Sequence, residues 1–250
     1  TFSHARNEIL DMDEPDAKTG YRKQEGHPIN QYFGLICDGF VTQADLDNPN
    51  FPKSTYGNVQ VGDLKYRDMN GDGFIDDRDE TFIGYSDIPE NTYALTLGAQ
   101  WKGIGFSVMF QGVDHVSRFY DAEAMFAFVN GGKVKEHHLG RWNPAMSEEY
   151  NLANATYPLL HYDSYGNHNQ RQNSFFLKNG AFLRLKNIEL SYSLPQSWIK
   201  KAAMKECRIY VNASNLVTWD HLGGLTDPES NGSNRYPIMK TVNFGVNIQF

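Results

Sequence analysis

The sequence has no long hydrophobic run, few cysteines and no excess of basic charge. No segment contains the ~18 consecutive apolar residues that a transmembrane helix needs, so a membrane-spanning helix is excluded. The formal net charge of −7, with no basic patch interleaved with aromatics, argues against a nucleic-acid partner. Two cysteines, Cys37 and Cys207, cannot build a disulfide framework, and both lie in strand-like runs as small apolar residues do. The chain starts without Met or a signal peptide, which favours a piece of a longer protein.

Aromatic residues and glycine are abundant instead. The 250 residues include 14 Tyr, 16 Phe, 4 Trp and 22 Gly, and the mean hydropathy is −0.56. A barrel strand crosses a membrane with about ten residues that alternate between lipid and lumen, so its average stays hydrophilic. Composition therefore leaves a soluble protein and a membrane β-barrel both open.

The clearest predicted strand is the last one, at 241–250. A two-residue period over this length indicates a strand with one apolar and one polar face. Its polar positions hold Thr, Gly and uncharged amides, whereas a soluble sheet would more often place charges there. The apolar positions are Val242, Phe244, Val246, Ile248 and Phe250.

Similar alternation predicts seven strands in all. The residues 102–105, Lys-Gly-Ile-Gly, form a tight glycine-containing connection that favours an antiparallel hairpin between its two flanking strands. The expected strands lie near 1–10, 31–41, 91–102, 106–119, 182–194, 207–218 and 241–250, with the first two the weakest.

The connections between these strands alternate in length. The short set comprises 11–30, 103–105 and 195–205, and the long set comprises 43–90, 121–180 and 220–239. Short turns at one end and long loops at the other are typical of an up-and-down membrane barrel, whereas a β-sandwich has no reason to separate loop lengths in this way. The sequence therefore predicts an all-β fold of antiparallel up-and-down strands, the C-terminal part of a transmembrane β-barrel, with the three long loops external.

The residues 68–79 read DMNGDGFIDDRD and match the calcium loop D-x-[DN]-x-[DN]-G closely. A hard cation takes six to eight oxygen ligands, and a loop of this length can wrap them around one centre. Gly73 stands at position 6, where the chain turns sharply, and Ile75 at position 8 is expected to point inward. The predicted ligands are Asp68, Asn70, Asp72, the carbonyl of Phe74, Asp76 and Asp79.

The match departs from the motif at position 12, where Asp79 replaces Glu. Its shorter side chain reaches a bidentate geometry less easily, so Asp77 or a water would complete the shell. The variant resembles extracellular dockerin-type sites. The flanking residues look extended and not helical, which favours a structural clip of weak extracellular-type affinity over a calcium switch. The alternative is a surface turn without metal.

No enzyme motif occurs. The sequence has no nucleophile elbow, Walker loop, dinucleotide fingerprint or zinc-protease histidine pair. Carboxylates are plentiful, so a glycosidase pair stays open, but sequence gives no separation between carboxyls. We therefore expect no enzymatic activity.

The predicted loop 121–180 and its approach are rich in aromatic residues. Aromatic faces beside amides suit a sugar- or peptide-binding surface, but a loop of this size also needs a small core of its own. Both interpretations stand, and the candidates for ligand contact are Phe119, Tyr120, Trp142 and Tyr162.

Several segments, in order along the chain, together resemble SusC/RagA-type TonB-linked (TonB-dependent) outer-membrane transporters. They are GDLKYRDMNGDGFID at 62–76, Ile83-Gly84 with Pro89 and Tyr93, FQG at 110–112, RWNP at 141–144 with Tyr157-Pro158, FLRLKNIELSYSLP at 182–195, and RIYV at 208–211 with Asn215-Leu216.

The resemblance implies a part of a nutrient importer in the Gram-negative cell outer membrane, in contact with its lipid. Such transporters take up oligosaccharides (glycans) or peptides through a plugged barrel of about 22 strands. A SusD-like surface lipoprotein covers their external loops, and TonB supplies energy through an N-terminal part that these 250 residues lack. Seven strands cannot close a barrel, so this piece is not expected to transport alone. The alternatives are a soluble calcium-stabilised β-sandwich binding module of a secreted carbohydrate-active protein, and a carbohydrate-active enzyme domain.

Overall fold

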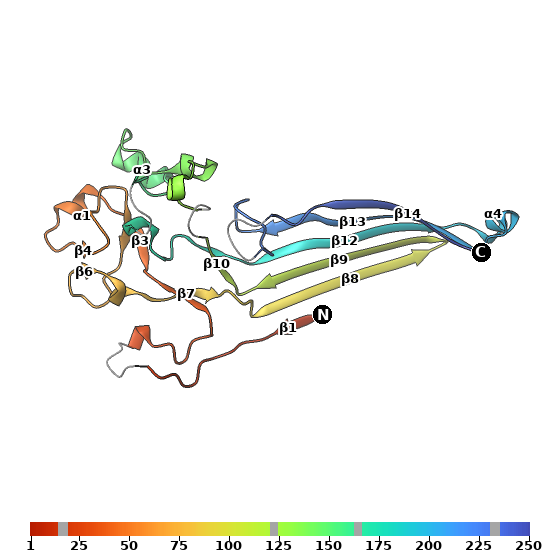
Figure 1. Cartoon of the computed structure of the whole chain (residues 1–250), viewed down its shortest axis with the longest axis horizontal. Coiled ribbons are helices and arrows are strands. Elements are labelled where there is room, and N and C mark those ends of the chain that lie inside the picture. The colour runs from red at the N-terminus through yellow and green to blue at the C-terminus, as the bar shows by residue number, and fades with distance from the viewer. Residues whose placement is uncertain (15–19, 121–124, 163–166, 231–235) are drawn as a thin grey trace.

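Alternating residues build one long antiparallel sheet, the wall, in the computed structural model of the chain (Figure 1). The structure describes residues 1–14, 20–120, 125–162, 167–230 and 236–250. The order of the six wall strands follows the chain once the loops are set aside. The strands are β1 (Phe2–His4), β8 (Asn91–Trp101), β9 (Ile104–Asp114), β12 (Phe182–Ser193), β13 (Glu206–Asp220) and β14 (Thr241–Gln249).

The long loops gather at one end of the wall into a second region, the head, while the short turns lie at the other end (Figure 1). The strands of the head are β2 (Gln31–Gly34), β3 (Cys37–Phe40), β4 (Lys53–Ser54), β5 (Leu64–Tyr66), β6 (Phe74–Ile75), β7 (Thr81–Ser86), β10 (Ser117–Phe119) and β11 (Leu177–Asn179). Its helices are α1 (Gln43–Asp47) and α3 (Glu148–Asn154), with 3₁₀ turns η1 (Gly20–Arg22), η2 (Asp77–Asp79), η3 (Val129–Gly131), η4 (Glu136–Gly140) and η5 (His168–Gln170). The turn end carries α4 (Gln196–Ile199) and η6 (Lys200–Ala202).

The register of the wall aligns apolar side chains of five strands into continuous rows. Directly paired residues of neighbouring strands lie on the same face of a sheet. The rows read Leu97–Val108–Ile188–Ala213–Val242, Ala99–Phe106–Leu190–Val211–Phe244 and Trp101–Ile104–Tyr192–Ile209–Val246. This face is open: Phe244 is 83% exposed and Ile248 is 50% exposed. Neither residue lies in a closed hydrophobic interior, as a β-sandwich would require.

The opposite face of the wall is polar. One row across it reads Gly98–Ser107–Glu189–Asn212–Asn243. Arg208 donates to the carboxylate of Glu189 and, at 3.1 Å, to the Ser191 hydroxyl, so charges on this face are paired within it. The predicted separation of apolar and polar residues between two faces is therefore present along the whole wall.

A β-bulge keeps the apolar side chains of strand β12 on one face of the wall. In its sequence, Leu183 and Leu185 occupy odd positions, whereas the apolar residues from Ile188 onward occupy even ones. The structure pairs Leu185 with Phe110 and Asn187 with Met109, so Lys186 is an extra residue. An inserted residue shifts the alternation by one position. Ile188 thereby returns to the apolar face.

The wall connections confirm the alternation of short and long loops, but three expected strands are corrected. The strand expected near 1–10 is formed only at Phe2–His4, and the strand expected near 106–119 ends at Asp114, with Ser117–Phe119 forming β10 in the head. The expected strand near 31–41 does not join the wall: it divides into β2, which pairs with β7, and β3, which pairs with β5. Its residues alternate as a strand should, but both partners lie in the head. The expected short connection 11–30 is therefore part of one long loop from β1 to β8, and the wall has six strands, not seven.

The β8–β9 connection is as tight as the sequence predicts. Trp101 pairs with Ile104, so only Lys102 and Gly103 lie between the strands. Both have positive φ, 48° and 87°. Two consecutive left-handed residues form the turn whose twist matches that of an antiparallel hairpin.

The main hydrophobic core of the molecule lies in the head. Residues from all three long loops contribute to it, so the head folds as one unit and not as separate loops. The buried members are Leu35, Leu64, Tyr66, Ile75, Tyr120, Met125, Phe126, Val129, Tyr157, Phe176 and Leu222. Among the described residues, no helix is long and apolar enough to cross a membrane.

Two buried histidines join the segments of the head. The Nδ1 of His168 lies 2.7 Å from the Ser54 hydroxyl, and its Nε2 donates to the Leu64 carbonyl at 2.6 Å. The Nε2 of His138 lies 2.9 Å from the Met125 carbonyl oxygen. Burial lowers the pKa of both imidazoles below the ordinary histidine value of 6.5. Each is therefore neutral in the fold near neutral pH.

Acidification should weaken the head. A histidine with a depressed folded pKa contributes stability above its unfolded pKa, and this is lost as pH falls toward the folded value. Thermal unfolding of the purified protein, followed from about pH 8 to about pH 5, should show stability falling below about pH 6.5. The His168→Gln variant should give a shallower pH dependence. An unchanged slope in this variant would mean that His168 is not a titrating contributor.

Candidate functional site

The loop 68–79 turns in the head as the motif requires. Gly71 and Gly73 have φ values of 72° and 81°, a region that L-residues with side chains rarely adopt. The Asp68 carboxylate accepts the backbone N–H of Gly71 at 2.7 Å and that of Gly73 at 2.8 Å. Asp68 at position 1 therefore lies at the centre of the turn.

The next two predicted ligands also face the turn. The side-chain oxygen of Asn70 accepts the N–H of Asp72 at 2.9 Å, and the Asp72 carboxylate accepts that of Phe74 at 2.9 Å. Such side-chain to backbone bonds are typical of Asx turns. They leave further lone pairs on each oxygen for a cation.

In this structure the positive charge of Arg78 lies between two of the carboxylates predicted to bind a cation. Its guanidinium lies 2.7 Å from a carboxylate oxygen of Asp72 and 2.7 Å from one of Asp76. The hydrogen bond from Arg78 lowers the pKa of Asp76. Two of the predicted ligands are thus joined by one positive charge, which the sequence pattern did not reveal.

Asp79 closes the loop from position 12. Its side chain is fully buried, and its two oxygens accept the N–H groups of Met69 and Asp76, both at 2.9 Å. Burial raises the pKa of this carboxyl, and the nearby Asp68 charge adds to the rise. The shorter side chain at this position therefore holds the two ends of the loop together.

The backbone at position 7 turns a carbonyl away from strand β4. Strand β6 pairs in parallel with β4, where the Gly73 carbonyl accepts from Lys53 at 2.9 Å and the Ile75 carbonyl accepts from Thr55 at 3.0 Å. Successive carbonyls of a strand point to opposite sides, so that of Phe74 points away from β4. Ile75 is 2% exposed and points inward, as expected.

The donor set fits a hard cation in chemical type. Its members are carboxylate, amide and carbonyl oxygens of one loop, the ligands that calcium takes. Within the described ranges, no group of three or more His, Cys, Asp or Glu side chains converges on a metal-holding geometry. The carboxylates are instead engaged by N–H groups and by Arg78, so a cation has to displace that side chain.

Asp77 points out of the loop and joins it to the second long loop. Its carboxylate accepts the Tyr56 hydroxyl at 2.7 Å and the Arg171 guanidinium at 2.7 Å. Arg171 also lies over the Tyr56 ring, 4.2 Å from the centroid, and 3.5 Å from Glu80. Asp77 therefore does not face the ligand centre in this structure. Sequence reasoning had no signal for Arg171, which is remote along the chain.

The four aromatic candidates for ligand contact occupy different environments. Tyr120 and Trp142 are both 2% exposed and pack in the head, as the core interpretation predicts. Phe119 is half-buried against the same core. Tyr162 is 89% exposed. The structure thus gives no support for ligand contact by Tyr120 or Trp142, and contact remains a prediction for Tyr162 and for the exposed part of Phe119.

Comparisons with known proteins give relatives of one kind. No protein-family model matches the chain. It is similar to the TonB-dependent receptor P26 of Formosa agariphila, 26% identical over 206 residues, which covers 76% of this chain and 20% of the relative. The TonB-dependent receptor P3 of the same organism is 25% identical over 248 residues, 91% of this chain and 23% of the relative. The chain thus spans about a quarter or less of the length of these two relatives.

Solved structures agree in fold. The RagAB peptide importer in the open-open state superposes with a TM-score of 0.66 at 24% identity, over 100% of this chain and 26% of that chain. The RagAB peptide transporter gives a TM-score of 0.63 at 24% identity, over 91% and 23%. The resemblance predicted from the sequence is confirmed at this level: the chain is similar in sequence to TonB-dependent receptors over most of its length, and it has the fold of part of the RagAB chains.

Proposed function

We propose that the chain is the C-terminal wall and outer head of an outer-membrane nutrient importer, which acts by binding and transport and not by catalysis. The observation that carries this proposal is the open apolar face of the wall. Its rows continue across five strands, and residues such as Phe244 lie bare on it. Soluble proteins rarely expose apolar patches of this extent, whereas lipid requires them.

The head lies outside the cell in this proposal. Barrels of this class place their short turns toward the periplasm and their long loops outside, and the two sets lie at opposite ends of the wall (Figure 1). Among the described residues, the edge strands β1 and β14 pair on one side only. Further strands of a longer protein would complete the barrel there, and TonB would act on its N-terminal part.

Exposed apolar side chains on the head favour the presence of a protein partner. Helix α3 and the segments before it carry apolar side chains in solvent, including Leu139 at 72% and Tyr150 at 53% exposure. A cluster of this kind marks an interaction surface more often than a free one. A SusD-like surface lipoprotein would dock here. The cargo would be an oligosaccharide or a peptide, and the similarity in fold to the RagAB peptide importer supports the second.

The two faces of the wall should respond oppositely to charge. Phe106 and Ser107 are adjacent on β9, and both are exposed, but Phe106 belongs to the apolar face. Arginine on a lipid face costs about 2–4 kcal/mol at the bilayer midplane and less toward the interfaces, and Phe106 is the third residue of β9. Phe106→Arg should therefore reduce the folded, heat-modifiable fraction of the full-length protein in outer membranes, and Ser107→Arg should not. Equal tolerance of the two substitutions would exclude lipid contact.

The loop 68–79 is, in our proposal, a calcium clip that stiffens the head. Support comes from the oxygen donors around one turn, and from the links that leave the loop for the second long loop. One link joins Asp77 to Arg171. The other is indirect: β6 of the loop pairs with β4, and Ser54 of β4 bonds to His168. A cation that fixes the loop would therefore also fix both of its neighbours.

Calcium should raise the thermal stability of the purified full-length protein in detergent. A ligand that binds only the folded state adds about 2.7 kcal/mol at one hundred times its Kd. Asp68→Ala should abolish the calcium-dependent shift, because it removes the carboxylate at the centre of the turn. Arg78→Ala should instead increase calcium affinity, because it removes the competing cation. Differential scanning fluorimetry and calorimetric titration would measure both.

The matched control is Asp77→Asn. It makes the same charge change within the same loop, but its side chain bonds outward to Tyr56 and Arg171. The calcium shift should survive in this variant. A shift that persists in Asp68→Ala, or is lost only in Asp77→Asn, would place the cation elsewhere.

A further inference from the structure

An arginine on the polar face of the wall is fully buried although its strand faces an open surface. Arg184 on β12 has 1% of its side chain exposed. Its guanidinium lies 2.7 Å from the Asp227 carboxylate through Nη2 and 2.9 Å from the Glu229 carboxylate through Nη1. Both acids belong to the third long loop, between β13 and β14.

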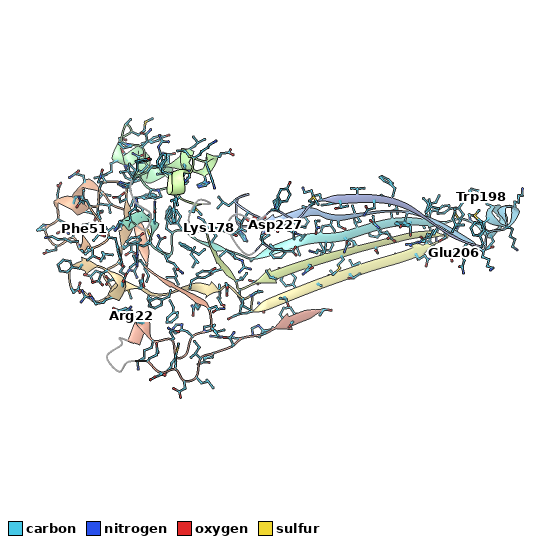
Figure 2. All side chains as sticks on the ribbon, in the orientation of Figure 1. Arg22, Phe51, Lys178, Trp198, Glu206 and Asp227 are labelled. Carbon is cyan, nitrogen blue, oxygen red and sulfur yellow. The ribbon has the colours of Figure 1, made fainter. Side chains whose placement is uncertain are left out.

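The segment 222–230, which we call the strap, covers this arginine. Leu222 at its start is 2% exposed and belongs to the core of the head. Asp227 accepts the N–H of Glu229 at 2.9 Å on its side chain and that of Ser230 at 2.9 Å on its carbonyl. The strap thus runs from the head to the wall, and Figure 2 shows Asp227 at the end of the sheet nearest the head.

The bulge in β12 adds a second cation to the same place. Lys186, the inserted residue, reaches both oxygens of Glu229 at 3.0 and 2.9 Å. Arg184 and Lys186 therefore share one carboxylate on the polar face. The wall contributes two positive charges to this contact and the strap contributes two negative ones. The two cations are therefore neutralised by these acids only while the strap lies against the wall.

One N–H group of Arg184 has no hydrogen-bond acceptor among the described residues. Its Nε is buried, and no acceptor within the described part of the chain bonds it. Buried polar groups are nearly always bonded, so an orphan N–H calls for an explanation. A guanidinium fork recognises carboxylates in a planar geometry, and here one N–H remains for another oxygen.

We propose that Arg184 and Lys186 form a binding site for carboxylate-bearing ligands, and that Asp227 and Glu229 of the strap occupy it as an internal substitute. An acidic ligand that enters from the head end displaces the strap and takes its place on the two cations. This rests on the proposed import role only for the ligand's route, since the binding itself needs no transport. The carboxylate can belong to an acidic peptide or to an acidic sugar.

Strap release can be measured without transport. Ser230 is 9% exposed, so a Ser230→Cys variant of the full-length protein in detergent should react slowly with a maleimide. Background from the native thiols is small, because Cys207 is buried and burial raises the pKa of Cys37 to about 11. Asp227→Asn with Glu229→Gln should speed the reaction severalfold. The control Glu149→Gln, an exposed acid on α3, should not.

Ligand probes then distinguish a carboxylate-binding site from a purely structural contact between the strap and the wall. Triglutamate or trigalacturonate should speed labelling of Ser230→Cys severalfold, whereas triglutamine and trigalactose should not. The probe that acts identifies a peptide or a sugar carboxylate. In the Asp227→Asn, Glu229→Gln background, where the strap no longer competes by charge, Lys186→Gln should weaken binding of that probe in calorimetric titration.

If neither acidic probe changes labelling while the charge-neutral strap reacts faster, the strap is only a structural brace and the site does not exist. Unchanged affinity on adding Lys186→Gln to the charge-neutral strap would also overturn the proposal. Binding without uptake by cells would leave the site standing and contradict the import function instead.

Discussion

The fold depends on one constraint, which is that every wall strand must keep its apolar residues on the same face as those of its neighbours. Because the side-chain period is two, a slip of one residue would exchange the faces of a whole strand. The antiparallel register holds the rows in line over five strands, with Leu190 between Phe106 and Val211. At β12 the sequence itself changes phase, and the bulge at Lys186 restores the alignment. The same bulge brings a cation to the polar face.

Local patterns in the sequence predicted most of the wall and little of the head. Alternation over ten residues is sufficient to define a long strand, and the five long wall strands lie close to where it indicated, although β9 ends at Asp114 and not at Phe119. It does not specify a partner, which is why 31–41 was assigned to the wall although β2 and β3 pair within the head. The phase change between Leu185 and Ile188 is a sign of the bulge in the sequence, because a regular strand cannot place both residues on one face.

The calcium loop could be proposed from sequence because its predicted ligands lie within twelve consecutive positions, and the turn at Gly73 depends only on local backbone geometry. The side chains that contact these predicted ligands and their neighbour Asp77 could not be predicted. Arg78 belongs to the loop, but nothing in the motif shows that it bridges Asp72 and Asp76. Arg171 lies 94 residues from Asp77, and only tertiary structure brings them together. Aromatic content likewise could not separate the buried Trp142 from the exposed Tyr162.

The two-residue turn at Lys102 and Gly103 has a consequence for how the wall assembles. The β8–β9 hairpin closes over almost no chain, so its entropic cost is small and its register is defined without help from other segments. Strand β12, by contrast, pairs with β9 across the whole second long loop, from Asp114 to Phe182. The hairpin is thus a natural template on which later strands add. Adding β12 brings together the two ends of the intervening loop, so its loop-closure cost is larger than that of the hairpin.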